Sequence, residues 1–360
     1  MDTSNQRLRV GICGLGFMGR TYFRHLREHP LARVVAVCDR LPALRAGHWD
    51  SPTGNIPTQM PLHPNLTGVA AYAGPAELIH DANVDVVAIT LPTPLHAEVA
   101  EQALLAGKHV ICEKPMARDL SGCDRMIAAA RSSGRTLMVA QCIRFWPQYE
   151  LIQQLVSQGR IGPLRFVKLS RLASPPVYSS ENWLMNGAAS GGALLDLHVH
   201  DVDFTQSWLG VPATIYARGG RGPSGEIDHV LSIYSYDDGR YALLEASWVH
   251  HAPWPFEMAI TVCGEKGTLH WSSLAGDDVL LYAGGQEALR LPAGGTTGWQ
   301  RELDYFLACI ASGQPVRRCP PESSRISIAL SLLERQSIEG RRPVTVPAEL
   351  RACAGAHPVF

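Results

Sequence analysis

Five short apolar runs alternate with amphipathic stretches over the first part of the chain. The runs are rich in β-branched residues and cover residues 8–13, 33–38, 85–90, 109–112 and 136–140. Such runs are typical of strands buried on both faces, as in a parallel sheet. Residues 17–28 and 96–106 have helical periodicity, and Gly107 follows the second stretch where a carboxyl-terminal cap belongs. The alternation predicts a doubly wound α/β domain over residues 1–142.

One segment interrupts this alternation. Residues 51–68 contain Pro52, Pro57, Pro61 and Pro64. Because proline removes a backbone donor that helices and strands need, we expect a loop there.

The pattern changes after about residue 145. Helical periodicity marks residues 149–158 and 193–209, a strand pattern marks 164–172, and alternating strands follow from about 213 to 292. Gly239 marks one hairpin turn and residues 264–267 mark another. Two helices are expected near 299–312 and 322–338. The sequence therefore predicts a second, α+β domain over residues 143–360, with helices on one face of an antiparallel sheet.

Composition narrows the possible partners. A chain of 360 residues fits two domains, and its formal net charge of −1 provides no long-range field for nucleic acid or an anionic membrane. No apolar run approaches the roughly 20 residues that cross a bilayer. The first nine residues lack a signal-peptide core, and the nine cysteines form no CxxC pair. We expect reduced thiols and a cytoplasmic protein.

A GxGxxG motif lies between the first predicted strand and the first predicted helix. It comprises Gly14, Gly16 and Gly19, with Phe17 and Met18 inside it. Gly14 makes the tight turn, Gly16 admits a pyrophosphate to the backbone, and Gly19 permits close helix–strand packing. The free N–H groups of the helix amino terminus then attract the anion. The motif alone is weak, but its position predicts a dinucleotide site.

Asp39 ends the second predicted strand, where a carboxylate accepts hydrogen bonds from an adenosine ribose. The same carboxylate repels a 2′-phosphate, which favours NAD. Arg40 is adjacent and leaves NADP possible, because an arginine there can pair with that phosphate.

Two further clusters carry candidate chemistry. Glu113 and Lys114 follow a predicted strand, and a lysine there can donate to a substrate oxygen. Asp196 and His200 are i and i+4 if residues 193–209 are helical, so the carboxylate can hold the imidazole or bind a substrate hydroxyl. His198 invites a metal interpretation, but residues i and i+2 lie about 200° apart on a helix. We therefore predict no metal.

Together these residues resemble the glucose–fructose oxidoreductase/inositol dehydrogenase/rhizopine-catabolism (Gfo/Idh/MocA) family. The resemblance is carried by GICGLGFMG, by residues 85–117 including EKP, by RF before Pro147, by GGALLDLHVHDVD and by the GEKGTL turn. It extends from about residue 8 to about residue 340. The EKP string followed by Asp-x-x-x-His is far more specific than the glycine motif.

The resemblance implies a Rossmann domain, a second domain with a large open sheet, and homodimers or homotetramers that pack through that sheet. It implies a nicotinamide between Lys114 and His200, a Lys114–Pro115 bond that is often cis, and Asp196 as the family's carboxylate. It also places Thr90, Pro92 and His96 beside the nicotinamide. Two features depart from the family: His198 replaces a small residue, and residues 51–68 replace a helical stretch.

We expect an NAD-dependent oxidoreductase that moves a hydride between nicotinamide and a sugar, cyclitol or related polyhydroxylated molecule. His200 acts as the acid/base, Lys114 polarises the oxygen and Asp196 anchors the substrate or the histidine. Two alternatives remain: an NAD-dependent glycoside hydrolase or eliminase that uses transient oxidation, and a non-catalytic NAD sensor. Weaker candidates for substrate contact share a polar or aromatic side chain in the second domain; they are Arg144, Trp146, Arg171, Tyr178, Trp183 and His198.

Overall fold

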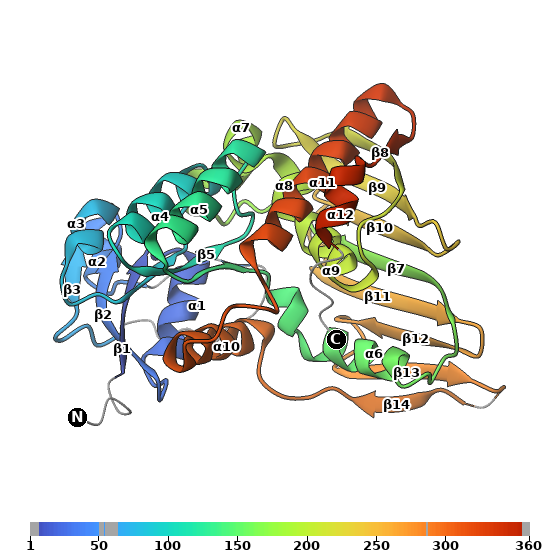
Figure 1. Ribbon diagram of the computed structural model, residues 1–360, viewed down its shortest axis with the longest axis horizontal. Coiled ribbons are helices and arrows are strands. Elements are labelled where there is room, and N and C mark those ends of the chain that lie inside the picture. Colours follow the sequence, from blue (N-terminus) through green and yellow to red (C-terminus); the bar gives the residue numbers. More distant parts are fainter. Residues whose placement is uncertain (1–6, 50–53, 55–63, 286, 355–360) are drawn as a thin grey trace. The chain divides into compact units, whose positions relative to one another are not determined.

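The computed structural model describes residues 7–49, 54, 64–285 and 287–354 (Figure 1). The chain forms two compact units. The first contains the chain up to Ala140 together with Val177–Trp183 and Trp299–Arg325, and the second contains Gln141–Pro176, Leu184–Gly298 and the residues from Ile326 onward. The first change of unit falls between Ala140 and Gln141, and the chain returns to the first unit at Val177–Trp183 and Trp299–Arg325.

The first unit is built on a parallel sheet of order β3-β2-β1-β4-β5-β6. Its strands are β1 (Leu8–Cys13), β2 (Ala32–Cys38), β3 (Ala70–Tyr72), β4 (Val86–Ile89), β5 (His109–Glu113) and β6 (Leu137–Ala140). The strand order changes direction between β1 and β4. Ligands of doubly wound sheets bind at such a point, beyond the carboxyl ends of the strands. The doubly wound prediction is confirmed.

Helices cover both faces of this sheet. They are α1 (Phe17–Leu26), α2 (Pro42–Arg45), α3 (Pro75–His80), α4 (His96–Leu105), α5 (Leu120–Ser133) and α10 (Gly298–Ser312), with the short 3-10 helix η1 (Thr93–Leu95). Figure 1 shows α4 and α5 on one face and α1 with α10 on the other. The ring of Phe17 packs edge-on against Trp299, which joins α10 to α1.

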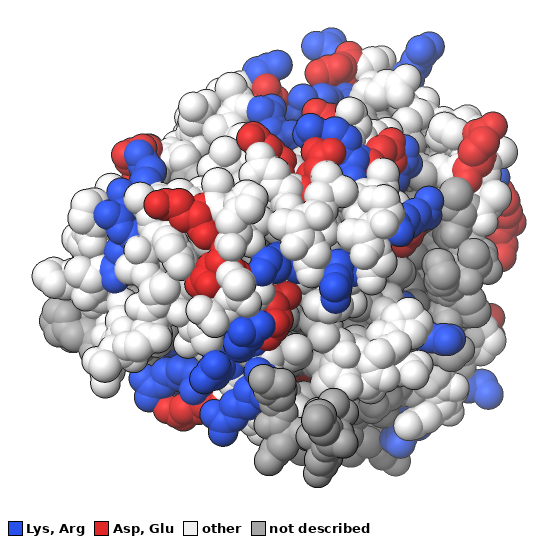
Figure 2. All heavy atoms as spheres, turned by 60° about the vertical axis from the view of Figure 1, so that its left-hand side comes forward, with Lys and Arg blue, Asp and Glu red and all other residues white. Residues whose placement is uncertain are grey.

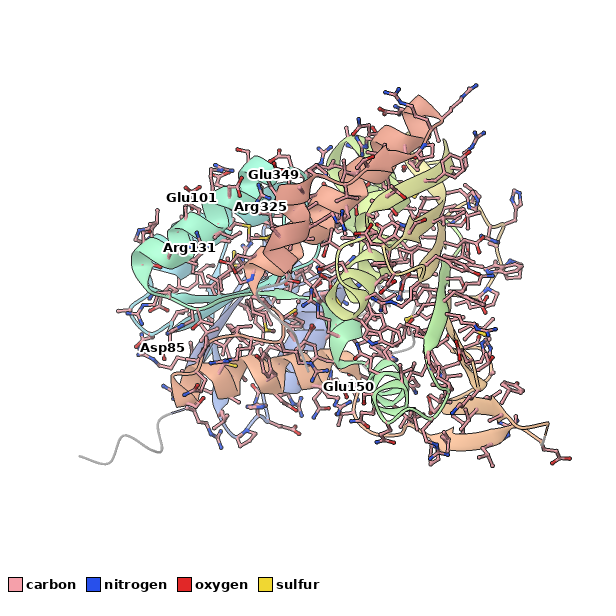
Figure 3. All side chains as sticks on the ribbon, turned by 45° about the vertical axis from the view of Figure 1, so that its right-hand side comes forward. Asp85, Glu101, Arg131, Glu150, Arg325 and Glu349 are labelled. Atoms are coloured by element: carbon pink, nitrogen blue, oxygen red, sulfur yellow. The ribbon has the colours of Figure 1, made fainter. Side chains whose placement is uncertain are left out.

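The amino ends of the central strands are fastened away from the ligand side. Arg9 on β1 makes a bidentate pair with Asp85, with Nη2–Oδ1 at 2.6 Å and Nε–Oδ2 at 2.8 Å. Figure 3 labels Asp85 among the side chains of the first unit. The Arg9 guanidinium lowers the pKa of the Asp85 carboxyl, mainly through that hydrogen bond. This pair fixes the register of β1 against β4 without occupying the carboxyl ends.

The second unit is built on a mixed sheet of order β14-β13-β12-β11-β7-β10-β9-β8-β15. The strands are β7 (Leu164–Leu172), β8 (Thr214–Arg221), β9 (Ile227–Ser235), β10 (Tyr241–Ser247), β11 (Glu257–Gly264), β12 (Gly267–Ser272), β13 (Asp278–Ala283), β14 (Leu289–Pro292) and β15 (Val344–Thr345). The sheet is mostly antiparallel, as expected, but β7 and β10 run parallel. The parallel pair arises because β7, which comes before α7, α8 and α9 in sequence, lies between β10 and β11 in the sheet.

Helices cover one face of this sheet. They are α6 (Pro147–Ser157), α8 (Gly192–Asp196), α9 (Val199–Leu209), α11 (Pro321–Gly340) and α12 (Ala348–Ala354), with the 3-10 helix η2 (Cys142–Phe145). Between β7 and α8 the chain forms the 3-10 helix η3 (Ser180–Met185), which begins in the first unit, and then α7 (Gly187–Ser190). Alternation in β9 is clear, since Ser232 and Tyr234 are buried while Leu231 and Ile233 are exposed on the opposite face.

The predicted single helix over residues 193–209 is divided, because α8 ends at Asp196 and α9 begins at Val199. Most of the proline-rich segment 51–68 lies outside the described residues, and its described end, residues 64–68, contains no helix or strand.

Surface charges of both signs are mixed, and the described cysteines form no disulfide. On the face drawn in Figure 2, acidic and basic side chains lie side by side over much of the surface. Among the described residues, eight cysteines are free thiols and no helix is long and apolar enough to span a membrane.

Candidate active site

The glycine motif forms a tight turn from β1 into α1. Gly14 has φ +95°, and a Cβ there would lie 2.6 Å from the carbonyl oxygen of Thr90. A Cβ on Gly19 would lie 1.8 Å from the carbonyl oxygen of Gly14, so the helix approaches the turn as closely as it can. A Cβ on Gly16, in contrast, would meet nothing within 4 Å. The turn therefore leaves open space at the one glycine where a pyrophosphate is expected.

The glycines that pack tightly are buried, and the glycine with open space beside it is partly exposed. Gly14, Leu15 and Gly19 are buried, whereas Gly16, Phe17 and Met18 keep partial exposure. Gly16 is the amino-terminal cap of α1 and has no side chain to satisfy the first N–H groups of the helix. These donors and the helix dipole suit an anion.

Asp39 follows β2 and braces the glycine turn. Its Oδ2 accepts a hydrogen bond from the Leu15 N–H at 2.8 Å, and its Oδ1 accepts one from the Leu41 N–H at 2.9 Å. Half-buried Asp39 thus fixes the loop that carries Gly16 and keeps lone pairs for a ribose hydroxyl. Arg40 is exposed and forms an ion pair with Glu181. The same side of the unit thus offers both the carboxylate expected for NAD and a neighbouring arginine.

The ends of β4 and β5 are joined by one imidazole. Buried His96, the first residue of α4, has Nε2 2.8 Å from the carbonyl oxygen of Leu91 and Nδ1 2.9 Å from that of Pro115. Thr90 donates from Oγ1 to the carbonyl oxygen of Gly14 at 2.7 Å, which ties β4 to the glycine turn. Pro92 caps η1 and is half-buried.

Lys114 stands at the carboxyl end of β5. The Lys114–Pro115 peptide bond is cis, which the resemblance implied. Lys114 is half-buried, while its neighbours Glu113, Pro115 and Met116 are buried. The lysine is therefore the residue of this turn that keeps access to a ligand.

A carboxyl group that sequence analysis did not single out lies in this unit. Glu302 on α10 is fully buried, and the Tyr22 hydroxyl is 3.4 Å from its Oε1. Burial first, and the negative charge of Glu113 second, raise the pKa of Glu302 well above its ordinary value. A glutamate in an amphipathic helix gives no sequence signal of burial, because its neighbours on α1 and β5 are distant in the chain.

Asp196 and His200 flank the break between α8 and α9. The His198 N–H donates to the carbonyl oxygen of Ala193 at 2.8 Å, an i to i−5 bond of the π type. Such widened turns recur at functional sites. Within residues 191–206, all of which are described, Asp196 and His200 alone keep partial exposure. The break therefore presents these two side chains from an otherwise buried segment.

Three candidate substrate contacts are engaged in buried ion pairs of the second unit. Arg144 donates to Asp203 at 2.6 and 2.7 Å, and Arg171 donates to Asp201 at 2.8 and 3.1 Å. His198 Nε2 lies 2.9 Å from Glu334 Oε1, and both side chains are fully buried. Both guanidinium groups are held bidentately inside the core, and the His198 imidazole is held there through Nε2, which favours a structural role. A substrate contact by these three residues stays a prediction.

The aromatic candidates are more exposed. Trp146 is half-buried against Gly298, where an added Cβ would lie 2.6 Å from its ring. Tyr178 and Trp183 are half-buried in Val177–Trp183, a segment of the first unit. Their substrate role stays a prediction. In the described part of the chain, no group of three or more His, Cys, Asp or Glu residues is placed to hold a metal ion.

Comparisons with known proteins agree with this geometry. The model of the oxidoreductase family with an NAD-binding Rossmann fold matches residues 8–141, and the GFO/IDH/MocA C-terminal domain matches residues 149–270. A trans-1,2-dihydrobenzene-1,2-diol dehydrogenase of Xenopus laevis is 30% identical over 315 residues, which cover 84% of this chain and 89% of that protein. Myo-inositol 2-dehydrogenase of Thermotoga maritima is 25% identical over 351 residues, covering 94% and 98%.

Solved structures share the fold. A levoglucosan dehydrogenase in complex with NADH superposes with a TM-score of 0.80 at 23% identity, covering 95% of this chain and 100% of that one. The likeness therefore includes both the parallel sheet and the mixed sheet.

Proposed function

Because the chain belongs to the GFO/IDH/MocA oxidoreductase family and carries its NAD-binding Rossmann domain, we propose that it is a dehydrogenase or reductase of a sugar, cyclitol or related polyhydroxylated molecule. The observation that carries the proposal is the exposure of Asp196 and His200 from a segment that is otherwise buried. Two polar side chains kept accessible beside a widened turn suit substrate contact better than packing.

The glycine turn and Asp39 fit the dinucleotide. Gly16 leaves room for a pyrophosphate, and the first N–H groups of α1 would hold it. Asp39 would accept from the adenosine ribose and favour NAD over NADP. Bound NAD supplies the carbon that exchanges hydride with substrate.

Three side chains of the protein would contact the substrate oxygen, its proton or a neighbouring hydroxyl. Lys114 would donate a hydrogen bond to the substrate oxygen and stabilise negative charge there. His200 would take the hydroxyl proton in oxidation and return it in reduction. Asp196 would hold a neighbouring substrate hydroxyl or orient the imidazole. Together these roles define an acid/base reaction at one CH–OH group. The names of the relatives, which act on myo-inositol and a dihydrodiol, support a vicinal diol or polyol as substrate.

The test is NADH formation from NAD with a panel of cyclitols, sugars and anhydrosugars. We expect Lys114→Ala and His200→Asn each to lower kcat by about 100-fold or more. Lys266→Ala and His251→Asn are matched controls, because both side chains are exposed and lie outside the outer face of the mixed sheet. Turnover within a few-fold of the unsubstituted protein for both Lys114→Ala and His200→Asn would reject the assignment.

The same assay separates the alternatives. Net NADH accumulation supports a dehydrogenase, whereas product release without NADH supports hydrolysis or elimination through transient oxidation. NADH binding without turnover of any substrate in the panel would favour a sensor.

The outer face of the mixed sheet supports self-association. Leu231 and Ile233 of β9 and Tyr241 of β10 are exposed large apolar side chains on the face that lacks helices. We propose that a second copy covers them in a homodimer or homotetramer. Sedimentation of Leu231→Glu should then show monomers, while Leu274→Glu, an exposed change in the loop after β12, should not.

A further inference from the structure

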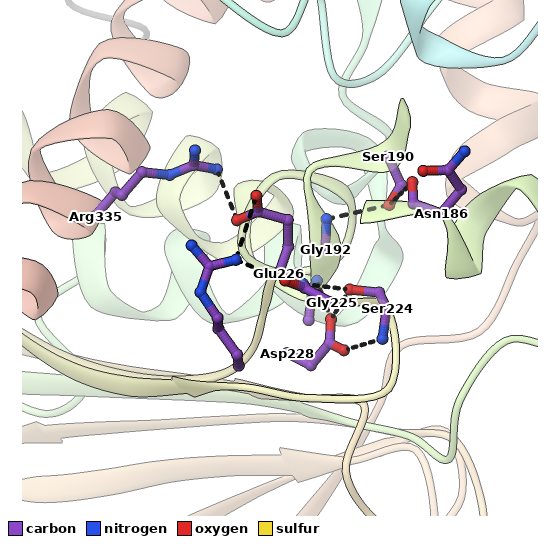
Figure 4. A network of polar contacts seen from close by, with 10 residues as sticks. Asn186, Ser190, Gly192, Ser224, Gly225, Glu226, Asp228 and Arg335 are labelled. Atoms are coloured by element: carbon purple, nitrogen blue, oxygen red, sulfur yellow. Dashed lines mark hydrogen bonds and ion pairs between the residues drawn. The ribbon is translucent and has the colours of Figure 1, made fainter. Parts of the chain in front are cut away.

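Strand β9 holds α8 through its first residues. The fully buried Asp228 accepts at Oδ1 from the Ala193 N–H at 3.2 Å, and from the Ser224 hydroxyl at 2.7 Å. Figure 4 shows this carboxylate beside Ser224 and Gly192. Gly192 has φ +69°, and a Cβ there would lie 2.9 Å from the Ile227 carbonyl oxygen. The half-helix that ends at Asp196 is therefore fastened closely to the start of β9.

The same strand holds α9 through a different set of side chains. Ser232 Oγ donates to Glu334 Oε1 at 2.6 Å, and His198 Nε2 lies 2.9 Å from the same oxygen. Ser232, Glu334 and His198 are fully buried. Glu334 on α11 thus bridges β9 to the residue immediately before α9.

These two attachments bracket the helix break. Ala193 is three residues before Asp196, and His198 is two residues before His200. The N–H groups of Leu197 and His198, between the two attachments, both donate to the Ala193 carbonyl oxygen, at 3.0 and 2.8 Å. Ser232 Oγ also lies 3.3 Å from His198 Nε2, so Glu334 and Ser232 hold the imidazole together. We infer that the placement of His200 relative to Asp196 follows the position at which Glu334 holds His198.

We propose that Glu334 is a positioning residue for His200 and acts through His198. This inference rests on the proposed function, which assigns the proton transfer to His200. Removing Glu334 would leave the His198 imidazole buried without its carboxylate, which favours movement of the turn. Misplacement of a reacting group by about 1 Å can cost about 100-fold in rate.

Other charged groups near α9 have their own partners. Asp201 pairs with Arg171 and Asp203 with Arg144, both on the helix side of the sheet. Tyr234 faces Glu334 from β9, and burial raises the pKa of its hydroxyl further above the neutral range. Tyr234 therefore stays protonated and does not compete with His198 for the role of charged partner.

Three variants change the buried pair of His198 and Glu334 in different ways. Glu334→Ala removes the bridge, Glu334→Gln keeps an acceptor without charge, and His198→Leu with Glu334→Leu replaces the pair by packed apolar groups. Glu339→Gln is the matched control, since Glu339 is exposed on the same helix. If Glu334→Ala does not fold, the double leucine variant still tests the proposal, because apolar replacement of a buried pair often preserves stability.

The readouts are the pH dependence of kcat, the Kd for NADH, and the NMR titration of the His200 imidazole in the absence of substrate. The His200 signal is assigned by its loss in His200→Asn. We expect Glu334→Ala and the double variant to lower kcat by about 10- to 100-fold and to move the His200 titration. Glu334→Gln should recover most of the loss, with an unchanged Kd for NADH in every variant.

The proposal is overturned if the folded Glu334→Ala or double variant keeps the wild-type pH profile and His200 titration and merely melts at lower temperature. The NMR titration needs no substrate. If no polyol is turned over, the proposed function fails, while an altered or unaltered His200 titration still decides the positioning role.

Discussion

The His96 imidazole binds the carbonyl oxygen of Pro115, the residue after Lys114, with Nδ1 and O 2.9 Å apart. Its other nitrogen lies 2.8 Å from the Leu91 carbonyl oxygen, at the end of β4. Both ring nitrogens thus lie within hydrogen-bonding distance of a carbonyl oxygen, and the tautomer decides which of them donates. His96 thereby links the two strand ends that flank the expected nicotinamide position.

We predict that His96→Gln weakens the turn that carries Lys114. A glutamine reaches only one of the two carbonyl oxygens, so a buried acceptor loses its partner. The free energy of unfolding should fall by about 1–3 kcal/mol, and the affinity for NADH should fall with it. Chemical denaturation and calorimetry measure the two effects. His80→Gln, on the exposed face of α3, should change neither, and an unaltered NADH affinity in His96→Gln would contradict the prediction.

The three glycines of the motif predict different outcomes for the same substitution. Gly19→Ala places a Cβ 1.8 Å from the Gly14 carbonyl oxygen, so it should destabilise the first unit and abolish NADH binding. Gly16→Ala meets nothing within 4 Å and has an ordinary φ of −69°, so the melting temperature should hold. Its NADH affinity should nevertheless fall by about tenfold or more, because the methyl group occupies the space expected for the pyrophosphate. A Gly16→Ala protein that binds NADH normally would place the pyrophosphate elsewhere.

The Rossmann unit was largely predictable from local sequence. Strands buried on both faces must be apolar, which is why β1 was predicted with its observed bounds and why β2, β4, β5 and β6 were placed within two residues. β3 was missed, because Ala70–Tyr72 is too short to show a pattern. The glycine turn was predictable since its residue requirements are steric and local.

The burial pattern of the second unit is less predictable from its sequence. Serines and a glutamate recur at helical spacing along α11, and the structure buries that polar stripe; its members are Ser324, Ser327, Ser331, Glu334 and Ser337. A polar stripe ordinarily indicates the solvent side of a helix. The polar stripe of α11 is buried because its side chains have hydrogen-bond partners far away in sequence. One of them is Asp203, which accepts from Ser327 Oγ at 2.7 Å. The sequence likewise does not reveal that Arg144, Arg171 and His198 pair with buried carboxylates far away in the chain.

Asp39 offers a test of cofactor choice. Asp39→Ala removes the acceptor of the Leu15 and Leu41 N–H groups and the expected acceptor of the ribose hydroxyls. The affinity for NADH should fall by about tenfold. The affinity for NADPH should rise relative to that for NADH, because the carboxylate that repels the 2′-phosphate is gone. Asp39→Asn retains an acceptor oxygen and should show the change in preference with less loss of stability. Calorimetric titration with both cofactors measures each effect, and an unchanged ratio in both variants would contradict the role of the charge.

Glu302 predicts a pH dependence of stability that a neutral side chain should remove. Its pKa is raised in the folded protein, so between the ordinary value of about 4.3 and the raised value it is protonated when folded and ionised when unfolded. Over that interval the unfolded chain binds fewer protons, and stability falls as pH rises, by up to about 1.4 kcal/mol per pH unit. Glu302→Gln retains a neutral hydrogen-bonding group beside Tyr22 and ionises in neither state. Its stability advantage over the unsubstituted protein should therefore be small near pH 4.5 and grow toward pH 8.

The measurement is urea denaturation of both proteins at several pH values, followed by fluorescence. Glu98→Gln serves as the control, because Glu98 is exposed on α4 and its replacement should give a difference that does not vary with pH. Other ionisable groups are common to the compared proteins, so the widening gap belongs to Glu302 and to the nearby charge of Glu113. A constant difference between Glu302→Gln and the unsubstituted protein across this range would mean that Glu302 is already ionised in the fold. In that case the end of β5 beside Lys114 would hold two buried carboxylates.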